Sequence, residues 1–141
     1  MIYLDTSIIV PAYCAEPLSD RVDALLLRES DVAISDLTEV EFYSALSQKV
    51  RRRDLTLDEV QQIADDFRSD LNSGIYRRLQ VELGHYQQAR NWIGQFSTVL
   101  RTLDALHLAI GHGYQMKVVT GDIGLAKSGQ IFGVDVELVI P

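Results

Sequence analysis

The sequence predicts a single α/β domain in which helices cover both faces of a mostly parallel central sheet of about five strands. Its 141 residues match the usual length of one domain. Short strand-like apolar runs alternate with longer segments of helical periodicity. Strands that are separated by helices form parallel sheets buried on both faces. We therefore expect residues 1–141 to form one three-layer α/β/α domain without an internal repeat or linker.

The expected strands are short and apolar. The first opens the chain, and Asp5 follows it directly. Helical segments separate the strands, as crossover connections in a parallel sheet require. The expected strands cover residues 2–4, 32–34, 75–81, 116–120 and 134–140.

Helical periodicity and capping signals define the segments between the strands. Ser19 is a candidate N-cap. Thr56 and Glu59 form a capping-box pattern ahead of a helix whose apolar residues share one face, and residues 72–74 end that helix. The expected helices cover residues 19–29, 38–53, 57–71, 85–96, 103–112 and 123–128, and an apolar stretch begins at Ile8.

Composition narrows the class of protein. With 47% hydrophobic and 23% charged residues the chain is close to the globular average, which excludes a disordered or coiled-coil protein. The single Cys14 cannot form an internal disulfide. No apolar run approaches the roughly 18 residues of a membrane span, and the N-terminus lacks the pattern of a signal peptide. We expect a soluble cytoplasmic protein that does not bind a membrane. The net charge of −7 argues against a broadly basic surface and favours a site for divalent cations or a basic partner.

Four carboxylates follow expected strands or begin the helices after them. In open parallel sheets, ligands bind outside the carboxyl ends of the strands, near the point where strand order reverses. Asp5 directly follows the first expected strand, and Asp122 follows the fourth after one glycine. Glu41 and Asp104 lie in the first turns of expected helices. These positions predict that the four acids share one crevice.

Each acid also has a purely structural interpretation. Glu41 completes a Thr38-x-x-Glu41 capping box. Asp104 lies where the helix dipole favours an acid, and Asp122 is a candidate N-cap. Asp5 is the hardest to explain in this way, because a carboxylate beside a buried strand needs a partner.

Taken together, the four acids favour a metal site. Like charges in one crevice raise one another's pKa and oppose folding unless a cation lies among them. A set of oxygen ligands suits Mg²⁺ or Mn²⁺. The histidines lack a zinc-binding spacing. We interpret them, with two further acids, as structural or surface residues: His85, His107, His112, Asp36 and Glu39.

Four short motifs carry these acids, in a fixed order along the chain. They are Tyr3-Leu4-Asp5-Thr6-Ser7, Leu37-Thr38-x-x-Glu41, Leu103-Asp104-Ala105-Leu106-His107-Leu108-Ala109 and Val119-Thr120-Gly121-Asp122. In order and spacing they resemble the PIN-domain nucleases, and more narrowly the VapC-like toxins of type II toxin–antitoxin pairs. The resemblance spans essentially the whole chain.

The resemblance implies an activity, a site and a set of partners. It implies endoribonuclease cleavage of RNA by an active site of Asp5, Glu41, Asp104 and Asp122 that holds Mg²⁺ or Mn²⁺. It also implies a central parallel sheet, a small antitoxin protein as partner and frequent homodimers. One departure is Gly121, which stands where the family pattern has a bulkier or charged residue.

A carboxylate-held metal ion can activate water and clamp phosphate oxygens during phosphodiester hydrolysis. We assign Asp5 and Asp104 as the main metal ligands. Glu41 and Asp122 complete the shell or act as general base. Two hydroxyls at the edge of the site, Ser7 and Thr120, are candidates for orienting a water or a phosphate, and ordinary capping or strand chemistry is the alternative.

One stretch of the chain is densely basic. It runs from Lys49 to Arg53 and includes Arg51 and Arg52; Arg77 and Arg78 lie further along. These residues are candidate phosphate contacts that confer salt dependence rather than sequence choice. The alternative is a solvated helix C-terminus, where cations complement the dipole.

Three other functions compete with the toxin interpretation. A phosphoryl-accepting receiver domain shares the architecture, but it needs several acids after the first strand, where only Asp5 stands. A catalytically silent α/β binding module is disfavoured because all four acids are present. A PIN-domain nuclease in RNA processing keeps the chemistry and changes only the biological role.

Overall fold

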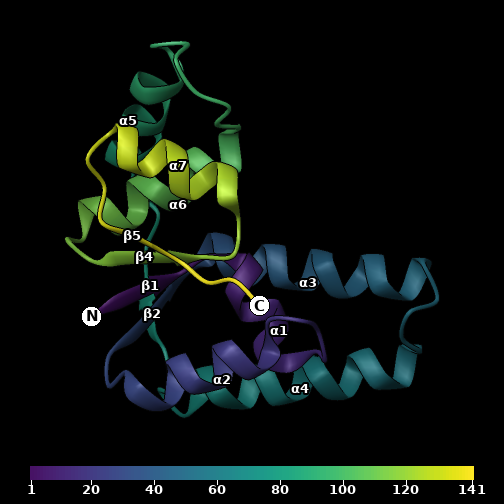
Figure 1. Ribbon diagram of the computed structural model, residues 1–141. Coiled ribbons are helices and arrows are strands. Elements are labelled where there is room, and N and C mark those ends of the chain that lie inside the picture. Colours follow the sequence, from purple (N-terminus) through teal and green to yellow (C-terminus); the bar gives the residue numbers. More distant parts are fainter.

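The computed structural model describes all residues, 1–141, and contains the five-stranded sheet that the sequence predicts. All four strand pairs are parallel, and the strand order is β3-β2-β1-β4-β5 (Figure 1). The strands are β1 (Ile2–Leu4), β2 (Val32–Ser35), β3 (Arg77–Leu79), β4 (Lys117–Thr120) and β5 (Val136–Leu138).

Helices cover both faces of this sheet, which confirms the three-layer α/β class (Figure 1). One face carries α1 (Thr6–Tyr13), α2 (Ser19–Arg28), α3 (Asp36–Arg51) and α4 (Leu57–Asn72). The other face carries α5 (Leu83–Ile93), α6 (Thr102–Gly113) and α7 (Ile123–Ile131). In Figure 1, α3 and α4 extend as a hairpin beyond the edge of the sheet.

The alternation of side chains along β1 separates two hydrophobic cores. Ile2 and Leu4 belong to the cluster beneath α1–α4, whereas Tyr3 belongs to the cluster beneath α5–α7. All three side chains are buried, as expected for the central strand of a parallel sheet. Tyr3 therefore carries its hydroxyl into the layer that also contains α6.

The path of the chain places a crevice at the carboxyl ends of β1 and β4. From β1 the chain moves outward to β2 and β3 on one side, and then returns to β4 and β5 on the other. Strand order therefore reverses between β1 and β4, where open α/β sheets bind their ligands. The backbone N–H of Asp5 donates to the carbonyl of Val119 (3.3 Å), so Asp5 lies beside the end of β4.

The beginning of α3 differs from the prediction. The helix begins at Asp36, and Ser35 is its N-cap, with a capping box formed by Ser35 and Thr38. The predicted capping box of Thr38 and Glu41 is therefore wrong. Glu41 lies in the second turn, where its carboxylate is free to make contacts outside the helix.

Other boundaries differ by a few residues. Strands β3 and β5 pair over three residues each, less than the 75–81 and 134–140 expected. Helix α5 ends at Ile93, before Gly94 and before Phe96, whose φ of +54° is incompatible with a continuing helix. The capping box of Thr56 and Glu59 is confirmed, with both hydrogen bonds present.

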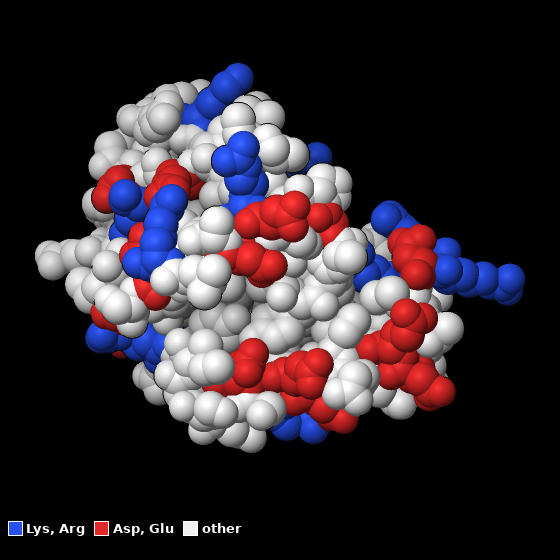
Figure 2. Space-filling model, turned by 60° about the horizontal axis from the view of Figure 1, so that its bottom comes forward, with Lys and Arg blue, Asp and Glu red and all other residues white.

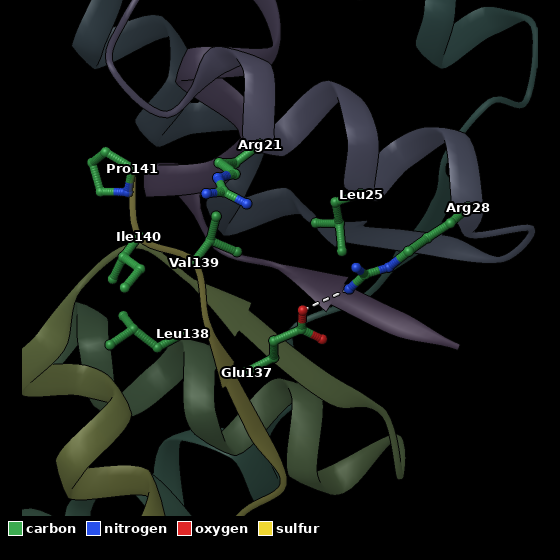
Figure 3. Close-up of a pocket in the computed structure, with 8 residues that line it drawn as sticks. All are labelled: Arg21, Leu25, Arg28, Glu137, Leu138, Val139, Ile140 and Pro141. Atoms are coloured by element: carbon green, nitrogen blue, oxygen red, sulfur yellow. Dashed lines mark hydrogen bonds and ion pairs between the residues drawn. The ribbon is translucent and has the colours of Figure 1, made fainter.

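Strand β5 and the C-terminal residues after it face α2 at one edge of the molecule (Figure 3). A hollow of about 360 Å³ lies between them, and Arg28 pairs with Glu137 across it at 2.6 Å. Both side chains are partly exposed, so this pair contributes little to stability. None of the helices combines the length and the apolar character needed to cross a bilayer.

Candidate active site

Asp5 is the most buried of the four predicted acids, with only 4% of the residue exposed. It takes the N-cap position of α1, but its carboxylate does not cap that helix. Instead, Oδ1 accepts a hydrogen bond from Ser7 Oγ (2.5 Å) and Oδ2 accepts one from Thr120 Oγ1 (2.6 Å). Burial raises the pKa of Asp5, and the imidazole of His107 and these two hydroxyls offset only part of that rise.

The two predicted supporting hydroxyls connect β1 to the loop after β4. Ser7 Oγ accepts a hydrogen bond from the backbone N–H of Gly121 (2.8 Å), and Thr120 Oγ1 accepts one from the N–H of Asp122 (3.0 Å). A Cβ atom at Gly121 would lie 2.7 Å from Leu18 Cδ1, so the glycine leaves room for Leu18. A larger residue at position 121, as in the family pattern, would require Leu18 to move.

Asp122 follows β4 and is the N-cap of α7, as the capping interpretation predicts. Its Oδ1 accepts a hydrogen bond from the N–H of Leu125 (3.0 Å). Only this oxygen is used by the cap. Asp122 can therefore fix the start of α7 and present its second oxygen to a ligand.

Glu41 is held from two sides by hydrogen bonds to one of its oxygens. Thr6 Oγ1 donates to Oε1 (2.8 Å), and His107 Nε2 lies 2.5 Å from the same atom. Burial acts to raise the pKa of Glu41, but the hydrogen bond and charge of His107 and the bond from Thr6 outweigh burial and lower it. Glu41 is therefore an ionised carboxylate at neutral pH.

Asp104 lies in the first turn of α6, as predicted. Burial raises its pKa, and the charges of Asp122 and Glu41 raise it further, while His107 acts in the opposite direction. The pKa of Asp104 therefore reflects its position among other acids.

The structure brings three of the four acids to one open hollow of about 480 Å³. Its lining residues are Glu41, Arg101, Thr102, Leu103, Asp104 and Asp122. Asp5 does not line this hollow; it joins the site through its hydrogen bonds to Ser7 and Thr120. Arg101, which the sequence analysis missed, is the basic residue of the lining, and its place just before α6 and three residues before Asp104 is a signal that could have identified it.

The chemistry of the donors fits a hard divalent cation, although no three acidic, histidine or cysteine side chains lie close enough together to form a metal-binding group. All candidate ligands are carboxylate oxygens, which Mg²⁺ and Mn²⁺ prefer. Negative charge in the hollow raises the pKa of Asp104, and a cation would relieve this repulsion.

His107, which the sequence analysis interprets as a structural or surface residue, lies against one of the four acids. Its side chain is buried, and its ring contacts Glu41. The sequence did hold a signal, because residues three apart on a helix lie on one face and His107 follows Asp104 by three. His85 keeps a structural role, with Nδ1 accepting a hydrogen bond from the N–H of Glu82 (2.9 Å).

The candidate phosphate contacts lie in two separate places. Arg51 ends α3 and bonds to Ser47, and Arg52 and Arg53 are exposed in the following turn. Arg77 and Arg78 lie on the edge strand β3. They form ion pairs with Asp31 (2.7 Å) and Glu39 (2.6 Å), respectively, so Glu39 has the surface role expected for it.

Comparison with known proteins identifies the family. The family profile described as PIN domain matches residues 2–129, which is most of the chain. The chain belongs to the PIN domain family. A search of curated proteins found no significant match.

Solved structures share the fold of this PIN domain over nearly their whole length. FitAcB from Neisseria gonorrhoeae is 22% identical, with 96% of each chain covered and a TM-score of 0.70. VapC20 from Mycobacterium tuberculosis, described as a sarcin-ricin loop cleaving toxin, is 16% identical, with 92% of this chain and 95% of that chain covered and a TM-score of 0.72. VapBC2 from Rickettsia felis, bound to a promoter DNA fragment, is 22% identical, with 98% of each chain covered and a TM-score of 0.70. At these identities the likeness establishes the fold.

Proposed function

We propose that this PIN domain is a metal-dependent endoribonuclease and the toxin of a type II toxin–antitoxin pair. The observation that carries the proposal is the hollow lined by Glu41, Asp104 and Asp122, beside buried Asp5, at the point where strand order reverses. A structural relative is described as a toxin that cleaves the sarcin-ricin loop, which supports RNA as the substrate class.

In this proposal Asp5 and Asp104 are the main ligands of Mg²⁺ or Mn²⁺, and Glu41 and Asp122 complete the site. Such an ion, when bound, activates water and neutralises charge on the phosphate. Glu41 is ionised and held in place, so it is suited to accept a proton from the attacking water. Asp122 lines the same hollow at the start of α7.

Arg101 is suited to bind the phosphate of the substrate. It lines the hollow beside three carboxylates and forms no ion pair with any of them. A guanidinium can donate two parallel hydrogen bonds to phosphate oxygens. An acidic site needs such a cation near it in order to hold an anionic polymer.

A cleavage assay tests the proposal directly. The purified chain should cut single-stranded or looped RNA with Mg²⁺ or Mn²⁺ and lose this activity in EDTA. Asp104→Asn should lower the rate by on the order of 100-fold or more, the usual effect of losing a catalytic group. Asp23→Asn, which makes the same charge change at an exposed position of α2, is the matched control and should cleave normally.

Two results would contradict the proposal of a metal-dependent nuclease. Full cleavage in chelator would exclude the metal mechanism, and absence of cleavage despite metal binding would favour a catalytically silent binding module. If cleavage is confirmed but expression of the chain does not arrest growth, a role in RNA processing would replace the toxin role.

We also propose a small antitoxin as partner, since several relatives were solved as toxin–antitoxin complexes. A groove of about 460 Å³ between α3 and α4 is lined mainly by apolar side chains, which suits an apolar helix of such a partner. A basic residue of the partner would enter the acidic hollow and bridge its carboxylates. The apolar lining residues are Tyr43, Leu46, Val50, Leu57, Val60 and Ala64.

Inhibition by the antitoxin can be separated from its binding. Replacing the partner's inserted Arg or Lys should restore cleavage with only a modest loss of affinity, because the apolar contacts supply most of the binding energy. Inhibition that persists undiminished would show that the partner blocks the path of the RNA instead.

The homodimer expected from the family resemblance stays a prediction, which sedimentation equilibrium can test.

A further inference from the structure

We propose that His107 is a positioning residue: it fixes the carboxylate of Glu41 so that one oxygen faces the acidic hollow. The inference rests on the proposed metal site and names a residue that prepares it. His107 is 3% exposed and lies on α6, one turn after Asp104. Its ring lies between Glu41 on α3 and Tyr3 on β1, so it joins three elements at the site.

Hydrogen bonds hold the ring at both of its nitrogens. An ionised carboxylate can only accept, so Nε2 donates to Glu41 Oε1 (2.5 Å). The hydroxyl of Tyr3 lies 2.7 Å from Nδ1, and burial raises the pKa of Tyr3 well above its usual range, so Tyr3 is a neutral hydrogen-bond partner of Nδ1. Its oxygen also lies 2.8 Å from Ser35 Oγ, which ties the chain of bonds to the N-cap of α3.

The arrangement leaves one oxygen of Glu41 free. Both donors, Thr6 and His107, are directed to Oε1, and Oε2 has no hydrogen-bond partner within the protein. Every fully buried polar side-chain atom in the molecule has a partner, so Oε2 is in contact with solvent. Because Glu41 lines the acidic hollow, this oxygen is available to a ligand there.

A purely structural role would be served more simply. Apolar side chains at positions 3 and 107 would fill the same buried space without the cost of desolvating a phenol and an imidazole. A chain of hydrogen bonds that ends on a carboxylate of the hollow is what orients a metal ligand. Loss of such an outer partner typically lowers metal affinity by about 10–100-fold.

Two substitutions separate the two contacts of the ring. The amide of His107→Gln can place an N–H near the position of Nε2 and keep the bond to Glu41. The shorter side chain of His107→Asn can place its amide near Nδ1, where it can meet Tyr3 but cannot reach Glu41. Tyr3→Phe removes the hydrogen-bond partner of Nδ1 without removing the ring.

The readout is Mn²⁺ binding in the absence of RNA, measured by electron paramagnetic resonance of the free ion. Thermal unfolding checks that each variant is folded. We expect His107→Asn to weaken Mn²⁺ binding by about 10–100-fold and His107→Gln to remain within a few-fold of the wild type. Tyr3→Phe should lie between them. Equal Mn²⁺ affinity in all three variants and the wild type would overturn the proposal, as would equal losses in Gln and Asn variants that both fold.

Crystal structures of the variants give a test that needs no metal. Glu41 should move away from its wild-type position in His107→Asn and keep it in His107→Gln; an unmoved Glu41 in both would overturn the proposal. If His107→Asn does not fold, Tyr3→Phe and Thr6→Val, which removes the other donor to Oε1, decide the question by the same two measurements. A wild-type chain that binds no Mn²⁺ would reject the proposed metal site, while the position of Glu41 would still decide the role of His107.

Discussion

Glu41 and Asp104 line the same hollow, yet their pKa values shift in opposite directions. Hydrogen bonds from His107 and Thr6 stabilise the charge of Glu41 more than burial opposes it. Burial and two neighbouring acids disfavour the charged form of Asp104 and raise its pKa. Two carboxylates with different protonation behaviour in one site are typical of acid–base chemistry. In the metal-free protein, Asp104 is the one whose charge opposes folding.

Asp104→Asn should therefore stabilise the metal-free fold at neutral pH. A carboxyl with a raised pKa binds its proton more tightly in the folded state, so wild-type stability falls as the pH rises from the unfolded pKa through the folded one. The variant lacks this loss. We expect a gain of up to about 1 kcal/mol near pH 7, typical of partly exposed charges, that vanishes below about pH 4. Urea unfolding at both pH values in EDTA measures it; a gain that is independent of pH would contradict the electrostatic cause.

The sequence predicted the four acids of the candidate site but not their partners. Asp5, Glu41, Asp104 and Asp122 could be selected because the carboxyl ends of parallel strands meet at one edge, a rule that needs only the order of elements. Assigning His107 to Glu41 requires knowing that α6 meets α3 beside β1, and residue spacing does not contain that information. Arg101 differs, because its place three residues before Asp104 is a signal in the sequence, although its role in the lining is seen only in the structure.

At the scale of elements, the capping signals were only partly decisive. Thr56 and Glu59 form the predicted box. Ahead of α3 the predicted box of Thr38 and Glu41 does not form, and the structure has one of Ser35 with Thr38. Ser35 ends β2 and is itself buried, so the helix begins as soon as the strand ends. The end of β5 was also overestimated: the last bond to β4 runs from the N–H of Val139 to the carbonyl of Thr120 (2.8 Å), and Ile140 lies beyond it.

The close packing of α6 on the sheet gives a prediction for one glycine. A Cβ atom at Gly111 would overlap Cγ2 of Val118 and lie 3.4 Å from Tyr3 Cδ1. Val118 is fully buried and its β-branched side chain is stiff, so it cannot move aside. Gly111→Ala should destabilise the fold by about 1–3 kcal/mol, as overpacking does. Adding Val118→Ala should remove the part of this loss that comes from the overlap.

Gly84 provides the matched control for this substitution. It lies in α5, and a Cβ atom there meets nothing within 4 Å. Gly84→Ala should stabilise the fold by up to about 1 kcal/mol, because alanine loses less conformational entropy on folding. Denaturant unfolding of both variants measures the contrast. A loss of stability at both positions would show that helix propensity and packing have been misjudged for this chain.

At the scale of the whole molecule, the proposed function requires a chain of net charge −7 to bind a polyanion. Figure 2, which brings forward the face that carries α2 and α4, shows acidic side chains in several groups. At its right-hand edge, where Figure 1 places the turn between α3 and α4, a basic side chain projects outward. Helix α3 runs from the acidic hollow to the turn between α3 and α4, because Glu41 lies near its start and Arg51 at its end. Ten residues of helix span about 15 Å, a distance that a few nucleotides of RNA can cover.

The two groups of arginines should therefore contribute differently to RNA binding. Arg51, Arg52 and Arg53 form no ion pair, so each can release counterions from a phosphate. Replacing all three with Gln should weaken binding of single-stranded RNA and lower the slope of log affinity against log salt by up to about 2. Fluorescence anisotropy across a salt series measures the slope, with Asp104→Asn as background to prevent cleavage.

Arg77 and Arg78 are the control for this triple substitution, because Asp31 and Glu39 already neutralise them. Replacing both with Gln leaves two carboxylates unpaired on β3's side of the sheet and should change the salt slope little. The added negative charge can still weaken RNA binding slightly. It should lower the affinity at every salt concentration by a similar factor, so the slope should change by less than the loss of one phosphate contact would cause. An equal fall in slope for both sets would show that RNA crosses the edge strand. A fall only for Arg77 and Arg78 would move the RNA path away from the α3–α4 hairpin altogether, and it would leave Arg51–Arg53 as cations that merely complement the end of α3.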